Sequence, residues 1–375
     1  MNTTARSPRR RPRRRTRRRV ERSIVRGAPM RLRIAAPLAL LLLFACAASH
    51  AQMTEQGFRN PPTWARPWVY WFWLNSNITK HGITADLEAM QRAGVGGVLI
   101  MEVDQGAPVG PVDFAGPQWR EMFQHVLREA ARLGLAVNMN NDAGWCGSGG
   151  PWMPAHLSMQ KVTIAEREVQ GPGRVEGPLP MPPIVANHYR EICVLAFPST
   201  GAYRLPDVQG KAAYVRRDLG EPAGLPEAPP DAIVQRGRIL DLTSRLRADG
   251  TLDWEAPAGR WTILRVGHTS TGAMNAPAPA TGRGLESDKL SKEATEAHFA
   301  GLMGKIIADS PALAGKVLVA THIDSWETGS QNWTPRMREE FTRRRGYDPL
   351  PFLPILAGRG VDSPLASERF LWHLR

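Results

Sequence analysis

The chain has 375 residues, which is enough for two or three average domains or for one α/β barrel with insertions. Its formal net charge of +13 suits a nucleic-acid-binding protein, but the charge is concentrated at one end. Residues 1–34 hold fourteen arginines and one acid, Glu21; without them, the 48 basic and 35 acidic residues of the chain fall to 34 of each. The remainder is electrically balanced. We therefore expect no nucleic-acid partner, with an arginine-rich nucleic-acid arm as the competing interpretation of residues 1–34.

An apolar stretch follows the arginines directly. Residues 34–45 are about a dozen mostly apolar residues, and Ala-Ser-His-Ala, ending at Ala51, comes soon after them. This order is typical of a secretory signal peptide, whereas a membrane-spanning helix needs about 20 apolar residues. We expect residues 1–51 to be an Arg-rich extension and signal peptide that is cleaved after Ala51. The mature chain would then be exported, to the periplasm or outside the cell, without an integral membrane span.

Several details of this leader stay open in the sequence. Met30 is followed by Arg-Leu-Arg, which is an ordinary beginning for a signal peptide, so Met30 is a better start than Met1. Cys46 fits the pattern of an outer-membrane lipoprotein imperfectly, because Phe44 is unusual there. Removal of the leader leaves Cys146 and Cys193, which could pair in an oxidising compartment, although their spacing does not decide it.

After the leader, strand patterns and helix patterns alternate. Short apolar runs with strand character occur at residues 68–73, 95–104, 135–142 and 316–324. Helical patterns occur at residues 84–93, 118–133, 292–308 and 335–344. We expect Thr84 to cap the first helix, and Gly94 and Gly134 to end the first two. Between residues 158 and 290, short β-type runs are separated by Pro/Gly turns without a helical pattern, which predicts an inserted all-β module.

This order predicts an α/β fold: the first half of a (β/α)8 TIM-type barrel with the all-β module inserted in a βα loop. We expect barrel units in residues 52–157, the β-rich module in residues 158–290 and the continuation of the barrel in residues 291–375. Four βα units are half of the eight that a barrel needs, and half a barrel leaves its inner sheet edge unpaired. The sequence stops within an amphipathic helical pattern at residues 367–375, so we expect a fragment or a truncated gene product.

Polar side chains recur at the C-terminal ends of the four predicted strands. Strand alternation places Glu102 on one face with Val98 and Ile100, which we expect to be the inward face. It likewise places His322 on one face with Leu318 and Ala320. Ionisable groups at one end of each strand are typical of an active site at the mouth of an α/β barrel, although an exit loop that is polar only for solvation is the plain alternative. These groups are Asn75 and Asn77; Glu102 and Asp104; Asn138, Asn140 and Asp142; and His322, Asp324 and Glu327.

Carboxylates beside tryptophans suit sugar chemistry. Aromatic faces stack on the C–H surfaces of pyranoses, and two carboxyls can protonate the leaving oxygen and activate water or attack the sugar. The tryptophans near these strands are Trp71, Trp73, Trp145, Trp326 and Trp333. For Trp71 and Trp73 a role in the core is equally open, because one sheet face must pack under the helices. We expect substrate contacts from Glu102, Asp104, Asn140, Asp142, Trp145, His322, Asp324 and Trp326.

Two kinds of metal site are also compatible with these residues. Glu102, Asp104, Asp142 and Asp324 supply the oxygen ligands that calcium prefers. His322 and Asp324 with Glu102 would also fit a transition-metal barrel hydrolase, but a single histidine at the strand ends argues against it.

Five stretches stand out as motifs, at residues 65–75, 97–106, 138–152, 284–290 and 322–327, the last two reading Gly-Leu-Glu-Ser-Asp-Lys-Leu and His-Ile-Asp-Ser-Trp-Glu. From about Phe58 to its last residue the sequence resembles the N-terminal half of the α-L-rhamnosidases of glycoside hydrolase family 106. The resemblance implies calcium-assisted, inverting hydrolysis of terminal α-L-rhamnosides of pectic or other plant glycans in a (β/α)8 barrel. Glu327 matches the catalytic carboxylate, and the partner glutamate is expected on a later strand, beyond Arg375.

Other functions stay open at this point. A different barrel glycosidase, of a retaining and β-galactosidase-like kind, would use the same strand ends, and so would a metal hydrolase. An exported, non-catalytic fragment that binds glycans would use the tryptophans without the carboxylate chemistry.

Overall fold

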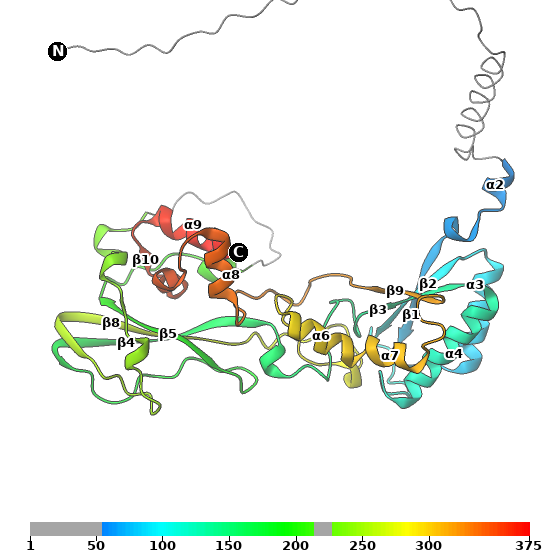
Figure 1. The fold of residues 1–375 in the computed structure, drawn as a ribbon, viewed down its shortest axis with the longest axis horizontal. Coiled ribbons are helices and arrows are strands. Elements are labelled where there is room, and N and C mark those ends of the chain that lie inside the picture. Colours follow the sequence, from blue (N-terminus) through cyan, green and yellow to red (C-terminus); the bar gives the residue numbers. More distant parts are fainter. Residues whose placement is uncertain (1–54, 214–226) are drawn as a thin grey trace, which may run out of the picture. The chain divides into compact units, whose positions relative to one another are not determined.

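The computed structural model describes residues 55–213 and 227–375 (Figure 1). The expectations for the leader, including the signal peptide, Met30 and Cys46, lie outside these residues. A short helix, α2 (Glu55–Arg59), belongs to a first unit that ends at Pro61, and a second unit runs from Pro62 to Arg375. In the part of the chain that is described, no helix is long and apolar enough to cross a membrane.

The second unit contains a parallel sheet of four strands in the order β1-β2-β3-β9. The strands are β1 (Trp68–Leu74), β2 (Gly97–Val103), β3 (Ala136–Asn140) and β9 (Leu318–His322), with helices α3 (Lys80–Arg92) and α4 (Pro117–Leu133) after the first two. The predicted alternation of strands and helices is therefore confirmed. Gly94 and Gly134 end the helices with positive φ, as predicted. The predicted cap is wrong, because Thr79 rather than Thr84 accepts the capping hydrogen bond, from Gly82 N.

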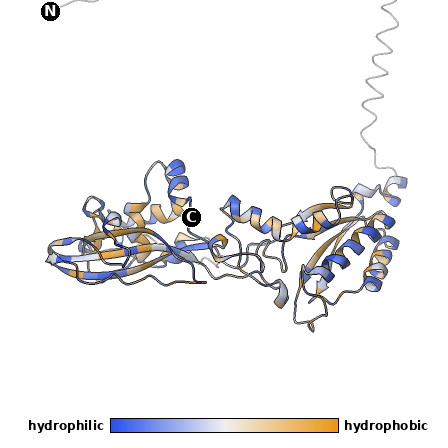
Figure 2. Cartoon of the chain, turned by 60° about the horizontal axis from the view of Figure 1, so that its bottom comes forward, coloured by the Kyte–Doolittle hydropathy of each residue, from blue (hydrophilic) through white to orange (hydrophobic). Residues whose placement is uncertain are grey.

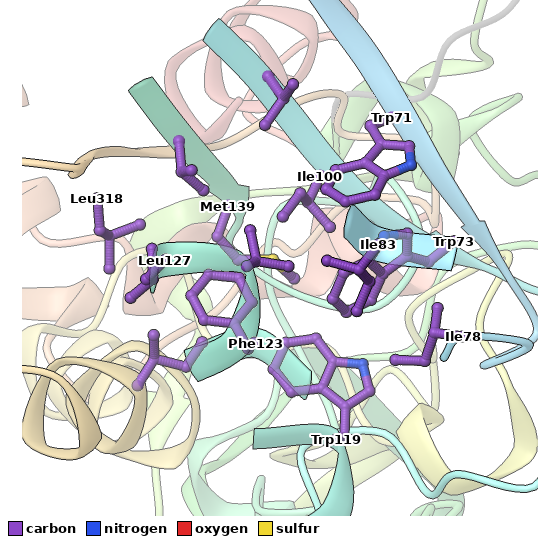
Figure 3. Close-up of a cluster of buried hydrophobic side chains, with 14 of the residues drawn as sticks. Trp71, Trp73, Ile78, Ile83, Ile100, Trp119, Phe123, Leu127, Met139 and Leu318 are labelled. Atoms are coloured by element: carbon purple, nitrogen blue, oxygen red, sulfur yellow. The ribbon is translucent and has the colours of Figure 1, made fainter. Parts of the chain in front are cut away.

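One face of this sheet packs against α3 and α4, and Figure 3 shows the core between them. Trp71 and Trp73 lie in this core, which decides their role in favour of packing. The opposite face of β1 leaves Tyr70 and Phe72 about half exposed. Figure 2 shows the outer sides of the covering helices as hydrophilic, as the apolar spacing within them requires.

The second strand is oriented differently from our expectation. Val98 and Ile100 pack in the core under the helices, so the face that carries Glu102 is the helix face and not the open one. Leu99 and Met101 lie on the other face in a separate cluster with Val103 and Trp145. All seven residues of β2 are buried, so hydrophobicity does not distinguish its two faces in the sequence.

The fourth strand, β9, departs from strict alternation. In its pairing with β3, Leu318 lies opposite Val137 and Ala320 opposite the next residue, so Val319 is an extra residue in a bulge. Residues directly opposite each other point to the same side of a sheet. Leu318 therefore joins the helix-side core, whereas Ala320 and His322 point to the open face. The expectation that all three share one face is wrong, and the bulge is the reason.

Between β3 and β9 the chain forms an antiparallel sheet with the order β4-β8-β5-β7, in the range where the β-rich module is expected. The short strand β6 pairs in parallel with β10, which follows β9 in the sequence. The bounds are β4 (Gln160–Arg174), β5 (Arg190–Pro198), β6 (Ile233–Val234), β7 (Leu240–Asp241), β8 (Glu255–Ser270) and β10 (Gly360–Val361), with a short helix α5 (Val208–Ala212).

The last helices differ from the predicted barrel continuation. The helix predicted at residues 292–308 is broken at Leu302 into α6 (Lys292–Gly301) and α7 (Met303–Asp309). The next helices, α8 (Met337–Arg345) and α9 (Pro364–Leu374), pack on the antiparallel module through Phe341 and Phe370, with Leu195 and Leu264 among their neighbours. The helix that follows β9 therefore does not cover the parallel sheet. With a single buried side chain, Phe341, α8 lacks the apolar stripe that sheet-covering helices need.

Candidate active site

Three irregular segments meet at the C-terminal ends of β3 and β9. They are residues 141–153 after β3, residues 273–291 before α6, and residues 323–334 after β9. The backbone N–H of Ser325 donates to Trp145 O (2.8 Å), and that of Gly150 donates to Leu285 O (3.3 Å). The N–H of Lys289 donates to the side-chain oxygen of Gln331 (3.1 Å). Each segment is thus tied to another by hydrogen bonds.

The carboxyl of Glu327 lies at the exposed side of this junction. The indole N–H of Trp145 donates to Glu327 Oε2 at 3.0 Å. Trp326, the residue before it, exposes 43% of its surface. The structure therefore brings together three of the residues that the sequence singled out, from segments that are 182 positions apart. A solvated carboxyl beside two indole surfaces can exchange a proton with a sugar oxygen or with water.

His322 and Asp324 lie on the same strand end. His322 is opposite Asn140 in the sheet register, and its Nε2 is 3.7 Å from Asp324 Oδ1. This nitrogen has no hydrogen-bond partner among the described residues. His322 is therefore placed to pair with Asp324, and the expected substrate contacts of both residues stay a prediction.

Asn140 and Asp142 are completely buried, unlike the residues above. The amide of Asn140 donates to Asp142 Oδ1 (2.8 Å) and to Gly144 O (2.6 Å), and Gly147 N donates to the same carboxylate oxygen (3.2 Å). Burial raises the pKa of Asp142 well above its usual value, and the nearby charge of Glu286 adds to this. Through these bonds the two residues hold the glycine-rich loop, residues 143–150, in place. Their burial leaves no surface for a sugar, which corrects the expectation of direct contact.

Glu102 is also fully buried, on the helix side of the sheet. It accepts hydrogen bonds from Ser76 N (2.6 Å), Ser76 Oγ (3.0 Å) and the indole N–H of Trp119 (3.1 Å). Burial raises the pKa of Glu102 to about 7, against the opposing effect of these bonds. It anchors the turn after β1 to α4, so the expectation that it contacts substrate is corrected too. Asp104, two residues on, is half-exposed and lies 3.5 Å from Arg283.

Residues 284–290 join these segments; they form one of the sequence motifs, but no site role was predicted for their side chains. Glu286 is fully buried; Ser148 Oγ donates to its Oε2 (2.7 Å), and the ammonium of Lys289 pairs with the same oxygen. Asp288 accepts hydrogen bonds from Gln331 Nε2 (2.6 Å) and from the hydroxyl of Thr334 (2.7 Å). The sequence did offer a signal for such a role: three ionisable residues, Glu286, Asp288 and Lys289, lie within four positions of a non-helical segment.

A buried histidine holds the glycine-rich loop from the α6 side. His298 Nδ1 accepts from Gly149 N (3.3 Å) and from the Trp152 indole N–H (3.1 Å), while its Nε2 lies 2.8 Å from Asn141 O. Two donors at Nδ1 and an acceptor at Nε2 require the neutral tautomer with hydrogen on Nε2. Burial lowers the pKa of His298 to about 4.

The predicted metal sites gain no support from these positions. Across residues 55–213 and 227–375, no three His, Cys, Asp or Glu side chains are grouped so as to hold a metal ion. Asp142 and Glu286 each keep a buried oxygen without a hydrogen-bond partner in the described chain, but the Lys289 ammonium already pairs with Glu286. The described residues do not form an oxygen cage for calcium, and calcium stays a prediction. Cys146 and Cys193 are both buried and free.

A carboxyl and two tryptophans lie at one edge of a parallel sheet. This arrangement is typical of α/β enzymes that act on carbohydrates. The chain belongs to glycoside hydrolase family 106. The model of this family, described as alpha-L-rhamnosidase, matches residues 59–199 and 196–375. The resemblance seen in the sequence is thereby confirmed.

Two relatives extend this comparison. A protein of Formosa agariphila, provisionally named a beta-glucuronidase, is 39% identical over 327 residues, which are 86% of this chain and 28% of that protein. The solved structure of a rhamnosidase from Novosphingobium sp. PP1Y matches with a TM-score of 0.72 and 27% identity, over 85% of this chain and 44% of that one. The chain thus spans less than half the length of either relative.

We expect His298 to make folding stability depend on pH. The folded chain keeps His298 neutral to about pH 4, whereas the unfolded chain binds a proton below about pH 6.5. Between these values the unfolded state holds more protons, so the free energy of unfolding should fall as the pH falls, by about 3 kcal/mol from this residue. Urea unfolding near pH 7.5 and near pH 4 measures the loss. In His298→Gln the loss should shrink by about that amount, and an unchanged loss would contradict the assignment.

Proposed function

We propose that this chain forms catalytic structure of an α-L-rhamnosidase, which hydrolyses terminal α-L-rhamnosides of pectic or other plant glycans. The observation that carries the proposal is the exposed carboxyl of Glu327 at the end of β9, bound by Trp145 and adjacent to the exposed ring of Trp326. Membership of the rhamnosidase family and the likeness to a solved rhamnosidase support it.

We also propose that the parallel sheet is half of a (β/α)8 barrel. Its four strands are parallel and in sequential order, and both edge strands, β1 and β9, have a free side within the described chain. The open face carries aromatic side chains on β1 and polar ones on β3 and β9, as the inside and the mouth of a barrel do. The antiparallel module then occupies the loop between the third and fourth barrel strands.

In this proposal Glu327 acts as general acid or base. Inverting hydrolysis needs one carboxyl to protonate the leaving oxygen and another to activate water, with no covalent intermediate. The Trp145 N–H fixes one oxygen of Glu327, and the exposed side of the carboxyl is left for proton transfer. Trp326 and Trp145 supply stacking surfaces, and His322 and Asp324 supply groups for sugar hydroxyls. Calcium assistance stays a prediction of the family resemblance, and no step here depends on it.

The name of the Formosa relative suggests a uronic acid as a second candidate substrate. A uronate carboxylate would need a cation in the site. The two cations in the site segments, Lys289 and Arg283, already face the carboxylates of Glu286 and Asp104. This pairing favours a neutral sugar such as rhamnose over a uronate.

Glu327→Gln keeps the shape of the side chain and removes its proton chemistry. In the full-length protein, kcat for an aryl α-L-rhamnoside should fall by about 10²–10⁴-fold, the usual range for one general acid or base. KM should change much less, because stacking and hydroxyl contacts remain. Steady-state kinetics of the purified variant measures both.

Glu296→Gln, on the exposed side of α6, is the matched control and should keep parental kinetics. A Glu327→Gln enzyme within a few-fold of the parent would reject the catalytic role. Early-time NMR of the product distinguishes the mechanisms: a retained anomeric configuration would reject inversion and favour the β-galactosidase-like alternative. Binding of the rhamnoside without any turnover by the parent would favour a glycan-binding fragment.

We propose that the protein is exported, on the basis of the leader pattern in residues 1–51. In the native host, the mature protein should be recovered from the periplasm or the medium with its N-terminus at Gln52. N-terminal sequencing checks this. A protein that keeps Met1 or Met30 would contradict cleavage, and a lipid on Cys46 would support the lipoprotein alternative.

A further inference from the structure

Lys289 contacts the loop that follows β9 (residues 323–327) through the ring of Trp326. Its ammonium pairs with the buried carboxylate of Glu286 and lies 5.2 Å from the centre of the Trp326 ring. The lysine side chain itself is 18% exposed. A cation at this distance from an indole face is attracted by the ring, more strongly where water is largely excluded.

The Glu286 carboxylate that pairs with Lys289 is itself held by a hydrogen bond from Ser148. Glu286 is fully buried, and Ser148 Oγ donates to the oxygen that also meets Lys289. Removing one partner of a buried ion pair leaves an uncompensated charge, which is strongly unfavourable. Lys289 is therefore held at a defined position, from which its charge reaches Trp326.

The loop after β9 depends on such external anchors, because residues 323–327 lack regular secondary structure. Ser325 N donates to Trp145 O, and the Glu327 carboxyl accepts from the indole of the same residue. Trp326 lies between these two anchors in the sequence, and the ammonium of Lys289 lies over its ring. The loop is thus held by Trp145 of the segment after β3 and by Lys289 of the segment before α6. Lys289 is itself paired with Glu286.

We infer that Lys289, held in place by Glu286, is a positioning residue that fixes Trp326 and, through it, the carboxyl of Glu327. Lys289 acts through these neighbours and does not itself exchange a proton with the sugar. A merely structural role for the ion pair would change stability and leave the geometry of the loop unaltered. The kinetic part of the test rests on the proposed function, and the spectroscopic part does not.

The spectroscopic test uses fluorine NMR of protein labelled with fluorotryptophan. The Trp326 signal is assigned by its loss in Trp326→Phe. It should shift in Lys289→Met, return toward its parental position in Lys289→Arg, and stay unchanged in Lys292→Met, whose lysine side chain is 89% exposed on α6. An unchanged Trp326 signal in Lys289→Met would overturn the inference, whether or not the protein is a rhamnosidase.

The kinetic test compares the same variants on an aryl α-L-rhamnoside. In Lys289→Met, kcat should fall by about 10²-fold with KM within a few-fold, since small misplacements of a catalytic group have effects of that size. Lys289→Arg should recover part of the loss. Added to Glu327→Gln, the Lys289→Met change should lower kcat little further, because both act through one carboxyl. A parental kcat in Lys289→Met, or full additivity, would reject the positioning role while leaving the proposed function intact.

A second variant tests the inference if Lys289→Met does not fold. Glu286→Gln combined with Lys289→Met removes both charges of the pair, so the Glu286 carboxylate is not left unpaired in the interior. This folded double variant should show the same shift of the Trp326 signal and the same loss of kcat. Parental values of both in the double variant would overturn the inference.

Discussion

Close approach of backbone to backbone is the constraint on which the site depends. At Gly284, an added Cβ would lie 2.0 Å from Gly150 O, and at Gly144 it would lie 2.5 Å from Ala276 O. Gly144 also has a φ of +92°, a conformation that residues with a side chain rarely adopt. Two irregular segments can therefore lie directly against each other, and this contact brings Glu286 and Lys289 under the loop that carries Glu327.

This arrangement separates the polar residues of the strand ends into two layers. Asn140, Asp142 and Glu286 are buried and hydrogen-bonded to the loops, whereas Trp326 and Glu327 are exposed above them. Buried polar groups that are paired in this way rigidify the segments that they join. The exposed layer can then present a carboxyl and two aromatic faces at fixed positions, as a preorganised sugar site requires.

The periodic parts of the chain could be predicted from the sequence, because a repeating apolar pattern reports burial. The strands and the helix ends at Gly94 and Gly134 followed from this. The face of β2 did not, since every residue of that strand is buried. The bulge at Val319 could not be seen either, because it depends on pairing with β3 and not on the residues of β9 themselves. The surface on which α8 packs could not be predicted either, because α8 packs on the antiparallel sheet, whose strands are distant in sequence.

The site was predictable to the extent that its residues follow strands. Trp145, Trp326 and Glu327 were predicted in this way, and only the structure shows the hydrogen bond between Trp145 and Glu327. Lys289 and Glu286 lie on a segment without periodicity, and their partners are distant in sequence. A crystal structure of the protein with bound methyl α-L-rhamnoside tests the central claim most directly. We predict that the sugar lies beside the Glu327 carboxyl and against Trp145 or Trp326. A sugar bound on the antiparallel module instead would contradict the proposed site.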